Sequence, residues 1–310
     1  MKRLDVIGIG QICVDYIGFV NRFPRLEERV EIENLSVLSG GPTATALGLL
    51  ARFGMKVAII GKVGDDREGT IAKTDLERKG VSTSYLTVEP GKRSQISLIP
   101  VDKQTGSRTV FWSRGTFSPL RWEEVPKEAI ASARALHFDE LHSEAIIKAA
   151  HFAKQSGVIV SFDAGDYDES MLEMKGCIDI LIVSEDFIKR FCGGKSPREA
   201  IYKLKRFGAE VTTVTMSNRG SITLYRNEVI ELPAYRVKAV DTTGTGDVFH
   251  GAFLFAWLNR YEIGEALRFA SAAAAMNTLR LGASGGIPES PDEVKRFMNS
   301  HTLNHALDNE

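Results

Sequence analysis

The second half of the chain alternates between short apolar runs and amphipathic stretches, and this alternation constrains the fold more than any other feature. From residue 135 on, strands are predicted in LHFDEL, VIVSFDAG, IDILIVS, VTTVTMS and SITLYR, with helices between them in residues 143 to 155, EDFIKRFCG and REAIYKLKRFG. Such alternation predicts an α/β fold on a doubly wound, mostly parallel sheet flanked by helices, which binds ligands at the carboxyl ends of its strands. The polar residues at those ends are Asp139, Glu140, Asp163, Ser184 and Glu185.

Composition limits the range of functions. The chain has 310 residues, of which 43% are hydrophobic and 25% charged, which is typical of a single globular domain, here residues 1 to 310. A net charge of −1 gives no electrostatic case for binding nucleic acid or an anionic membrane, and no apolar run approaches the length of a bilayer span. The three scattered cysteines lack disulfide or zinc spacing, and MKRLDVIGIG reads as a first strand and not as a signal peptide. A reduced, cytoplasmic location is therefore expected.

The segment AVDTTGTGDVFHGAF, residues 239 to 253, places glycines directly before an apolar stretch long enough for a helix. Gly244 and Gly246 let the backbone turn sharply, which leaves the amides of the loop and of the first helical turn free to hold an anion. Asp247 does not fit a simple anion cradle, because its carboxylate would repel a phosphate. Its position suits a general base that takes a proton from an incoming hydroxyl. The alternative is that Asp247 only caps the helix.

The order of residues in DTTGTGDVFHGAF closely resembles the C-terminal signature of the ribokinase-like (PfkB) family of carbohydrate and nucleoside kinases. The resemblance extends over residues 4 to 298. It implies transfer of the γ-phosphate of ATP to a sugar hydroxyl, with Asp247 as the general base and with Gly244, Thr245 and Gly246 around the phosphoryl group. It also implies that Mg²⁺ accompanies ATP and that the partners are small molecules, a sugar and ATP.

Near the N-terminus, Asp15 matches the family's early aspartate, which binds hydroxyls of the acceptor sugar. One carboxylate can accept two hydroxyl donors, and vicinal diols offer such a pair. The resemblance continues at Gly40, Gly41 and the helix TATALGLLARFG, whose small residues indicate close packing. Thr45 replaces the usual Asn, as in a subgroup of ketose-type kinases that includes sulfofructose-kinase-like members. Leu141 stands where we place the anion-binding Arg of the sulfosugar kinases, so a neutral ketohexose or related sugar is the expected acceptor.

Two segments, at about residues 16 to 38 and 94 to 113, have the pattern of a small exposed sheet. In the second segment, strands predicted at 94 to 100 and 108 to 112 flank the hairpin signal DKQTGS. In the resembling family such a sheet is a lid over the sugar site and often pairs between two subunits, so a homodimer through the lid is expected. Arg108, Arg114 and Asp139 are candidate substrate contacts, and solvated strand residues are an equal alternative for the two arginines.

Candidate nucleotide contacts follow from the same resemblance. TMSNRG matches the family's T-x-G-x-x-G nucleotide loop with Ser217 in place of Gly, and SEDF departs from its N-x-x-E motif, which is tied to magnesium and phosphate. Glu185 or Asp186 could hold Mg²⁺ through water, and Glu185 is the candidate named for the site. The candidates for ATP binding are Ser184, Thr215, Ser217, Gly220, Ser271 and Asn277.

A potassium site is implied beside the glycine loop. In many members of the family, the residues equivalent to Asp241 and Thr243 hold K⁺ together with nearby backbone carbonyls. Leu281 and Ala283, in the loop of residues 281 to 286, are the candidates for those carbonyls.

Three rival functions stay open. A nucleoside kinase would need a pocket for the base, and SEDF mildly favours a catalytically weak homologue that only binds sugar or nucleotide. A dehydrogenase is disfavoured, because GIGQIC has Cys13 at the third glycine position of a dinucleotide fingerprint. His137 and His142 lie near Asp139 without zinc spacing, so core or rim histidines are expected. The polar tail beyond Ser300 is expected to fray.

Overall fold

A computed structural model describes residues 4–139 and 143–304, so Glu140, Leu141 and His142 lie outside the described residues. Its large sheet has nine strands in the order β13-β12-β11-β10-β9-β8-β1-β4-β5. Strands β5 through β11 of that order are parallel, and β12 and β13 are antiparallel additions at one edge, which confirms the predicted fold class. The bounds are β1 (Val6–Ile9), β4 (Val57–Gly64), β5 (Ser82–Glu89), β8 (Ala135–Phe138), β9 (Ile159–Ala164), β10 (Ile180–Ser184), β11 (Val211–Thr215), β12 (Ser221–Tyr225) and β13 (Glu228–Leu232).

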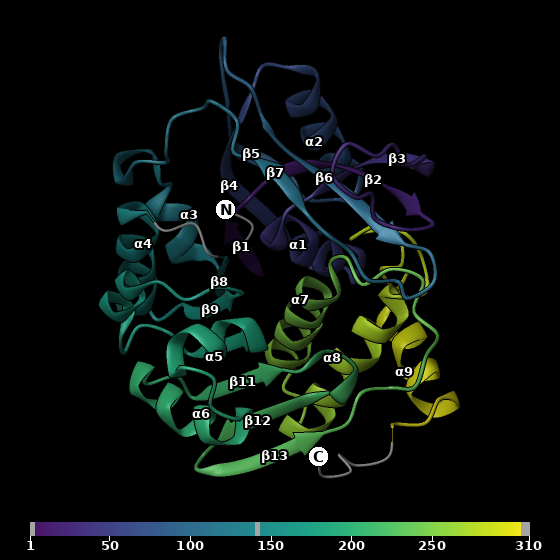
Figure 1. Cartoon of the computed structure of the whole chain (residues 1–310). Helices are drawn as coiled ribbons and strands as arrows, with labels where there is room; N and C mark the ends of the chain where they lie inside the picture. Colours follow the sequence, from purple (N-terminus) through teal and green to yellow (C-terminus); the bar gives the residue numbers. More distant parts are fainter. Residues whose placement is uncertain (1–3, 140–142, 305–310) are drawn as a thin grey trace.

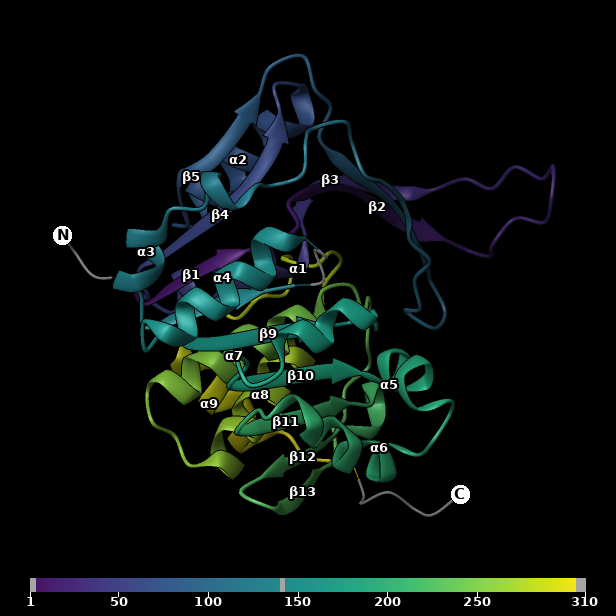
Figure 2. The ribbon, with the colours of Figure 1, turned by 90° about the vertical axis from the view of Figure 1, so that its left-hand side faces the viewer.

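Helices cover both faces of this sheet (Figures 1 and 2). One core contains side chains of α1 (Pro42–Arg52), α2 (Arg67–Arg78), α7 (Thr245–Leu258), α8 (Ile263–Asn277) and α9 (Pro291–Ser300). The other contains side chains of α3 (Lys127–Ser132), α4 (Glu144–Gln155), α5 (Glu185–Cys192) and α6 (Pro197–Leu204). Successive strand residues alternate between the two cores, as Val6 and Ile7 do, because side chains of a strand point to opposite faces.

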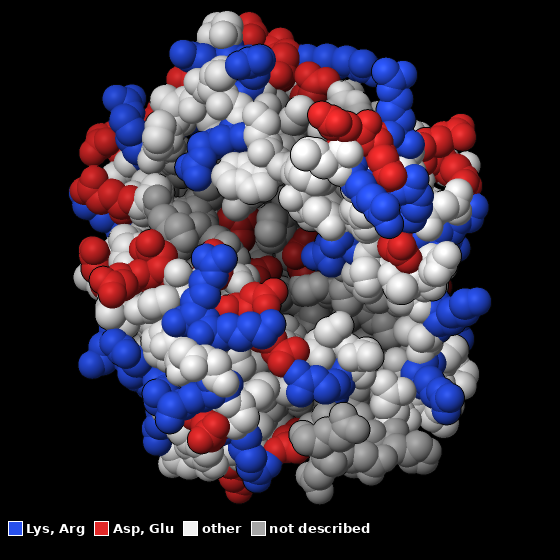
Figure 3. All heavy atoms as spheres, in the orientation of Figure 1, with Lys and Arg blue, Asp and Glu red and all other residues white. Residues whose placement is uncertain are grey.

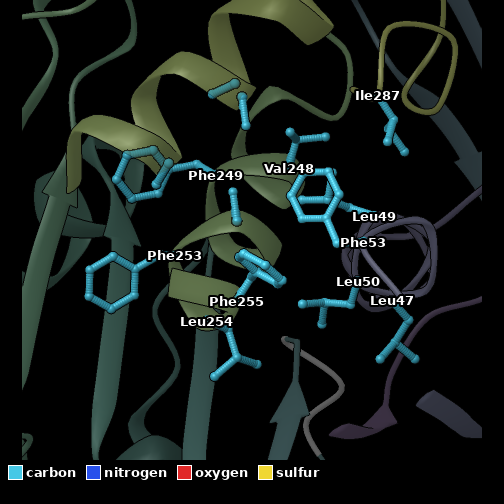
Figure 4. Close-up of a cluster of buried hydrophobic side chains, with 14 of the residues drawn as sticks. Leu47, Leu49, Leu50, Phe53, Val248, Phe249, Phe253, Leu254, Phe255 and Ile287 are labelled. Atoms are coloured by element: carbon cyan, nitrogen blue, oxygen red, sulfur yellow. The ribbon is translucent and has the colours of Figure 1, made fainter. Parts of the chain in front are cut away.

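Helices α1 and α7 pack closely, and this contact fixes the start of α7 (Figure 4). Leu49 and Leu50 of α1, and Phe53 directly after it, share one buried cluster with Val248 and Phe255 of α7 (Figure 4). Small residues allow the approach, since a Cβ at position 251 of α7 would lie 2.9 Å from a backbone oxygen of α1. The close packing predicted for this helix is confirmed.

A second sheet of four strands, in the order β3-β2-β6-β7, stands beside the large one and projects from the body of the molecule (Figure 2). Its strands are β2 (Cys13–Val20), β3 (Glu33–Gly40), β6 (Gln95–Asp102) and β7 (Phe111–Ser113). The hairpin predicted at DKQTGS is confirmed, with the Asp102 amide donating to the Ser107 carbonyl at 2.8 Å. The second strand of that hairpin is shorter than predicted, because Arg108 makes only an isolated bridge to Val101. We call this four-stranded sheet the lid.

Two parts of the fold differ from the prediction. Strands β5 and β13 lie at the two edges of the large sheet and carry exposed, polar sequence, so they lack the buried apolar run that marks the central strands. The tail does not fray at Ser300, since residues 302–304 pair with the segment of residues 234–236. None of the helices in the described parts of the chain combines the length and the apolar character that a bilayer crossing requires.

Candidate active site

The glycine loop leads directly into α7, as predicted. Gly244 occupies the N-cap position with φ 71°, and a Cβ there would lie 2.6 Å from the Cα of Ala283, so this position requires glycine. Helix α7 begins at Thr245, and no side chain caps it. Asp247 lies in the first turn and is therefore not the N-cap residue, and a hydrogen bond from its own backbone amide lowers the pKa of its carboxyl. Thr245 and Gly246, the first two residues of the helix, line the cavity, and a helix N-terminus at a cavity suits an anion.

Three carboxylates and one cation act on one another at this helix end. Burial raises the pKa of Asp247 from 3.8 to about 6, Arg108 lowers it, and the charges of Asp139 and Asp15 raise it. Burial also raises the pKa of Asp15. The base predicted at Asp247 is thus ionised at neutral pH and yet basic enough to accept a proton.

Asp15 lies on β2 of the lid and is 5% exposed. The Sγ of Cys13 donates to its carboxylate at 3.3 Å. Gly40, in the paired strand β3, leaves room for it, since a Cβ at Gly40 would lie 2.0 Å from the Asp15 carboxylate. Gly41 is the N-cap of α1 with φ 107°. Thr45, on α1, is buried, and its hydroxyl has no hydrogen-bond partner among the described residues.

Asp139 follows β8 and connects three elements. One of its carboxylate oxygens accepts from the Gln11 amide at 2.9 Å and from the Thr43 amide at 3.1 Å. The structure therefore gives this predicted substrate contact a second task, which is to hold the start of α1 against the loop after β1. Its charge also reaches Asp247.

The two lid arginines differ in position. Arg108 donates to the Thr242 hydroxyl at 3.1 Å and lines the cavity in front of the glycine loop. Arg114 lies over the ring of Trp112, 5.4 Å from its centroid, and is not among the residues that line that cavity. Of the two, the structure brings only Arg108 to the glycine loop.

The cavity itself has a volume of about 670 Å³. Figure 3 shows this face of the molecule hollowed near its centre, with acidic atoms inside the hollow and Lys and Arg atoms around it. Thr245 and Gly246 line the cavity, and so do five of the six residues predicted to bind ATP: Ser184, Thr215, Ser217, Gly220 and Ser271. Ser217 has φ 54°, so a serine here adopts the left-handed conformation that favours glycine.

Asn277, the sixth predicted nucleotide contact, is placed elsewhere. It is fully buried, it is not among the cavity-lining residues, and its amide donates to the Thr243 carbonyl at 3.0 Å. Its position on α8 supports the glycine loop from behind.

Residues of the SEDF segment form hydrogen bonds and ion pairs within the protein. The Ser184 hydroxyl caps α5 by accepting from the Phe187 amide at 3.1 Å, and it donates to the Gly165 carbonyl at 2.8 Å. Glu185 lines the cavity and forms an ion pair with Arg219 of the TMSNRG turn.

Asp241 ties the two loops of the predicted potassium site together. It is fully buried and accepts from the Thr243 amide at 2.9 Å, from the Thr243 hydroxyl at 2.7 Å and from the Gly282 amide at 2.7 Å. Gly282 lies between Leu281 and Ala283, so the loop of residues 281 to 286 is docked on the glycine loop through this carboxylate.

The histidine prediction is confirmed for His137. It is fully buried in β8, its Nδ1 lies 3.1 Å from the Ser161 hydroxyl, and burial lowers its pKa to about 4. His250 of α7 lies behind the site and pairs with Asp163 at 3.1 Å. Within residues 4–139 and 143–304, no group of three or more His, Cys, Asp or Glu side chains is arranged to hold a metal ion.

Comparison with known proteins decides the family. Residues 3–290 match the family model described as pfkB family carbohydrate kinase. The chain belongs to the pfkB family. As a pfkB kinase it is an ATP-dependent phosphotransferase.

Two relatives and one solved structure are similar to this pfkB kinase over nearly its whole length. It is 30% identical over 299 residues to the nucleoside kinase of Methanothermobacter thermautotrophicus, covering 94% of this chain and 95% of that one. It is 28% identical to the ribokinase of Haemophilus influenzae, covering 93% and 95% of the two chains. The ribokinase structure of Thermotoga maritima superposes with a TM-score of 0.81 at 25% identity, covering 96% of this chain and 99% of that one.

Proposed function

We propose that the protein transfers the γ-phosphate of ATP to a hydroxyl of a sugar held between Asp15 and Asp247. The observation that carries this proposal is the position of Asp247 in the first turn of α7, directly after the cavity-lining Thr245 and Gly246, with its pKa raised to about 6. A carboxylate at a helix N-terminus that only stabilised the helix would need neither the raised pKa nor the neighbouring acids.

In this proposal each residue has a defined step. Asp15 accepts hydrogen bonds from the sugar and orients it, and Asp247 removes the proton of the attacking hydroxyl. The amides of residues 244 to 247 hold the oxygens of the transferred phosphoryl group, and the Arg108 guanidinium adds positive charge there. Catalysis then rests on positioning and on charge stabilisation.

A ketohexose is the acceptor that the sequence favours. Thr45 replaces the usual Asn beside the sugar site, as in the ketose-type subgroup, and Asp15 offers two oxygens to adjacent hydroxyls. An anionic sugar would need nearby cationic side chains, and the sequence offers Arg108 and Arg114 as candidates. Arg114 lies over the ring of Trp112.

A nucleoside is the second candidate, and a specific feature of the lid favours it. Asp15, Ser97 and Trp112 are opposite one another on three neighbouring strands, so their side chains share one face of the lid. Trp112 is 56% exposed, and an exposed indole on that face can stack against a base. The relative with 30% identity is a nucleoside kinase.

The test is an ATP-consumption screen with fructose-like ketoses, ribose, their phosphates and adenosine, compared by kcat/KM. The best substrate among the ketoses identifies a ketohexose kinase, and preference for adenosine identifies a nucleoside kinase. ADP release with none of these acceptors, together with intact ATP binding, would identify a homologue that only binds its ligands and would overturn the proposal.

Mg²⁺ would accompany ATP and neutralise phosphate charge, as in other phosphoryl transfers. Glu185 and Asp186 fit as outer contacts because both line the cavity. Each carboxylate already has a cationic partner, Arg219 and Lys189 respectively, so we propose that the metal is bound mainly through the phosphates.

Potassium is the second metal ion that we propose, at Asp241 and Thr243 with the carbonyls of Leu281 and Ala283. The fit rests on Asp241, which is fully buried and forms no ion pair with Lys, Arg or His among the residues that the structure describes. A cation there would balance a buried charge that three neutral donors solvate only partly.

We expect both activity and thermal stability to rise with K⁺, because the ion would hold the glycine loop and the loop of residues 281 to 286 in place. The measurements are kcat and Tm in K⁺ and in tetramethylammonium at matched ionic strength. A ligand at 100 times its Kd stabilises the folded state by about 2.7 kcal/mol, which gives a measurable shift in Tm. Equal kcat and equal Tm in the two salts would contradict the site.

A homodimer through the lid is the assembly that we propose. The outer face of the lid carries four apolar residues opposite one another across its strands: Tyr16, Val37, Leu98 and Phe111. Leu98 and Phe111 are 50% and 60% exposed, and a second copy of the same face would cover them.

Light scattering is expected to give twice the 34.1 kDa of one chain for the wild type. The double variant Leu98→Glu, Phe111→Glu is expected to give the monomer, since like charges would then meet at the contact. A wild-type monomer at micromolar concentration, or a double variant that still dimerises, would rule out this interface.

A further inference from the structure

The segment after α9 returns along the wall of the nucleotide cavity. Leu303 pairs with Tyr235 in an antiparallel bridge, and the Arg236 amide donates to the Thr302 carbonyl at 3.0 Å. The Asn304 amide donates to the Ala234 carbonyl at 2.7 Å. Residues 302–304 thus add a short strand to a segment that itself lines the cavity, and Asn304 lines the cavity as well.

The side chain of Asn304 reaches the turn that carries the predicted nucleotide contacts. Its amide nitrogen donates to the backbone carbonyl of Asn218 at 2.9 Å, across 86 residues of sequence. Asn218 is the middle residue of η4 (Ser217–Arg219), and it also lines the cavity. The contact therefore joins the tail to the TMSNRG turn at the cavity wall.

The backbone conformation of this turn explains why an additional hydrogen bond would stabilise it. Ser217 has φ 54°, a left-handed conformation that is unfavourable for a residue other than glycine. Within the turn, the Arg219 amide donates to the Met216 carbonyl and the Gly220 amide to the Ser217 carbonyl, each at 3.1 Å. Neither bond uses the carbonyl of Asn218, so the hydrogen bond from Asn304 is an additional restraint on the central peptide.

We propose that Asn304 is a positioning residue for the nucleotide: it holds the turn of residues 217–219 in the conformation that binds ATP. This inference rests on the proposed function, because it takes the cavity to be the ATP site. Asn304 acts through the turn and through the shape of the cavity wall, and it takes no part in the phosphoryl transfer.

The test compares two substitutions at Asn304 with the same two at a matched position. Asn304→Ala removes the donor, and Asn304→Asp sets a carboxylate oxygen against the Asn218 carbonyl at nearly constant volume. Asn299→Ala and Asn299→Asp are the controls, because Asn299 lies five residues earlier on α9 and is exposed to solvent. They match the change in chemistry and in net charge.

We expect KM for ATP to rise about 2- to 10-fold in Asn304→Ala, as for the loss of one hydrogen bond, and further in Asn304→Asp. The kcat and the KM for the acceptor are expected to stay within twofold of the wild type. Without ATP, backbone amides of residues 217–220 are expected to exchange hydrogen faster in both Asn304 variants than in the wild type or the Asn299 controls.

The outcomes separate the two proposals. Equal KM for ATP and equal exchange in the Asn304 and Asn299 variants would overturn the role of Asn304, as would a fall in kcat with KM for ATP unchanged. A wild type that binds no ATP would overturn the proposed function and, with it, the nucleotide role. The exchange measurement then still reports whether Asn304 holds the turn. Thermal unfolding of all four variants identifies any that fail to fold.

Discussion

Asp247→Asn is expected to lower kcat by about 10²–10⁴-fold, the usual contribution of a general base, while ATP and sugar still bind. Asparagine keeps the volume and one acceptor oxygen of the side chain, but it cannot take the proton of the attacking hydroxyl. The measurement is turnover under saturating ATP and acceptor, with binding followed separately by calorimetry. The matched control is Asp292→Asn, which removes an exposed carboxylate from the first turn of another helix, α9.

Loss of folding cannot mimic this result. The folded-state pKa of Asp247 is raised from 3.8 to about 6, so its ionised form destabilises the fold once the pH exceeds those values. The Asp247→Asn variant carries no such charge, and it is expected to unfold at a Tm equal to or above that of the wild type at pH 8. Turnover within threefold of the wild type would contradict the assignment of Asp247 as the base.

The same pKa sets the pH dependence. Because the base must be ionised, kcat/KM is expected to fall tenfold per pH unit below about pH 6 and to level off above it. Arg108 lowers the pKa of Asp247, so Arg108→Ala is expected to move this midpoint to higher pH. A profile that is flat between pH 5 and 8 would exclude Asp247 as the titrating base.

Asp15→Ala is expected to lower kcat/KM for the acceptor by at least about 100-fold and to leave the Kd for ATP unchanged. Hydrogen bonds to a charged group contribute about 1.5–3 kcal/mol each, and two hydroxyls of the sugar would lose such a partner. The measurements are initial rates against acceptor concentration, and calorimetric titration with ATP alone. Asp15→Asn is expected to fall between the wild type and Asp15→Ala, because one acceptor oxygen is kept.

Glu31→Gln is the control for Asp15, since Glu31 lies in the exposed segment between β2 and β3 of the same lid. It changes the charge of the lid without touching the site. Acceptor kinetics in Asp15→Ala equal to those of Glu31→Gln would mean that Asp15 is a structural carboxylate of the lid. Loss of ATP binding in Asp15→Ala would instead place Asp15 in the nucleotide site.

Local signals predicted the parts of the site that lie within one turn of chain. The glycine loop is an example, because Gly244 needs a positive φ and the helix after it starts where the apolar run begins. The central strands could also be predicted from local sequence, because each is a short run of buried apolar residues between turns. Edge strands such as β13 lack that run, and only pairing with a neighbour makes them strands.

Contacts between segments that are far apart along the chain could not be predicted from the sequence. Arg108 meets Thr242 across 134 residues, and nothing in either neighbourhood marks the partner. Asn277 was predicted to contact ATP from its place on a small-residue helix, but its amide points to the Thr243 carbonyl. The direction of a helical side chain depends on which face packs, and periodicity cannot fix that face here because residues 270–275 of α8 are all small and buried.

The short crossing between the two sheets has a consequence for how this protein can diversify. Strand β1 ends at Ile9 and β2 begins at Cys13, so only residues 10–12 separate the large sheet from the lid. Because strand side chains alternate, an insertion there that shifted β2 by one residue would turn Asp15 away from the proposed acceptor site and bring a neighbour in its place. The exposed segment of residues 21–32 carries no such constraint, so we expect that its length can change without moving Asp15.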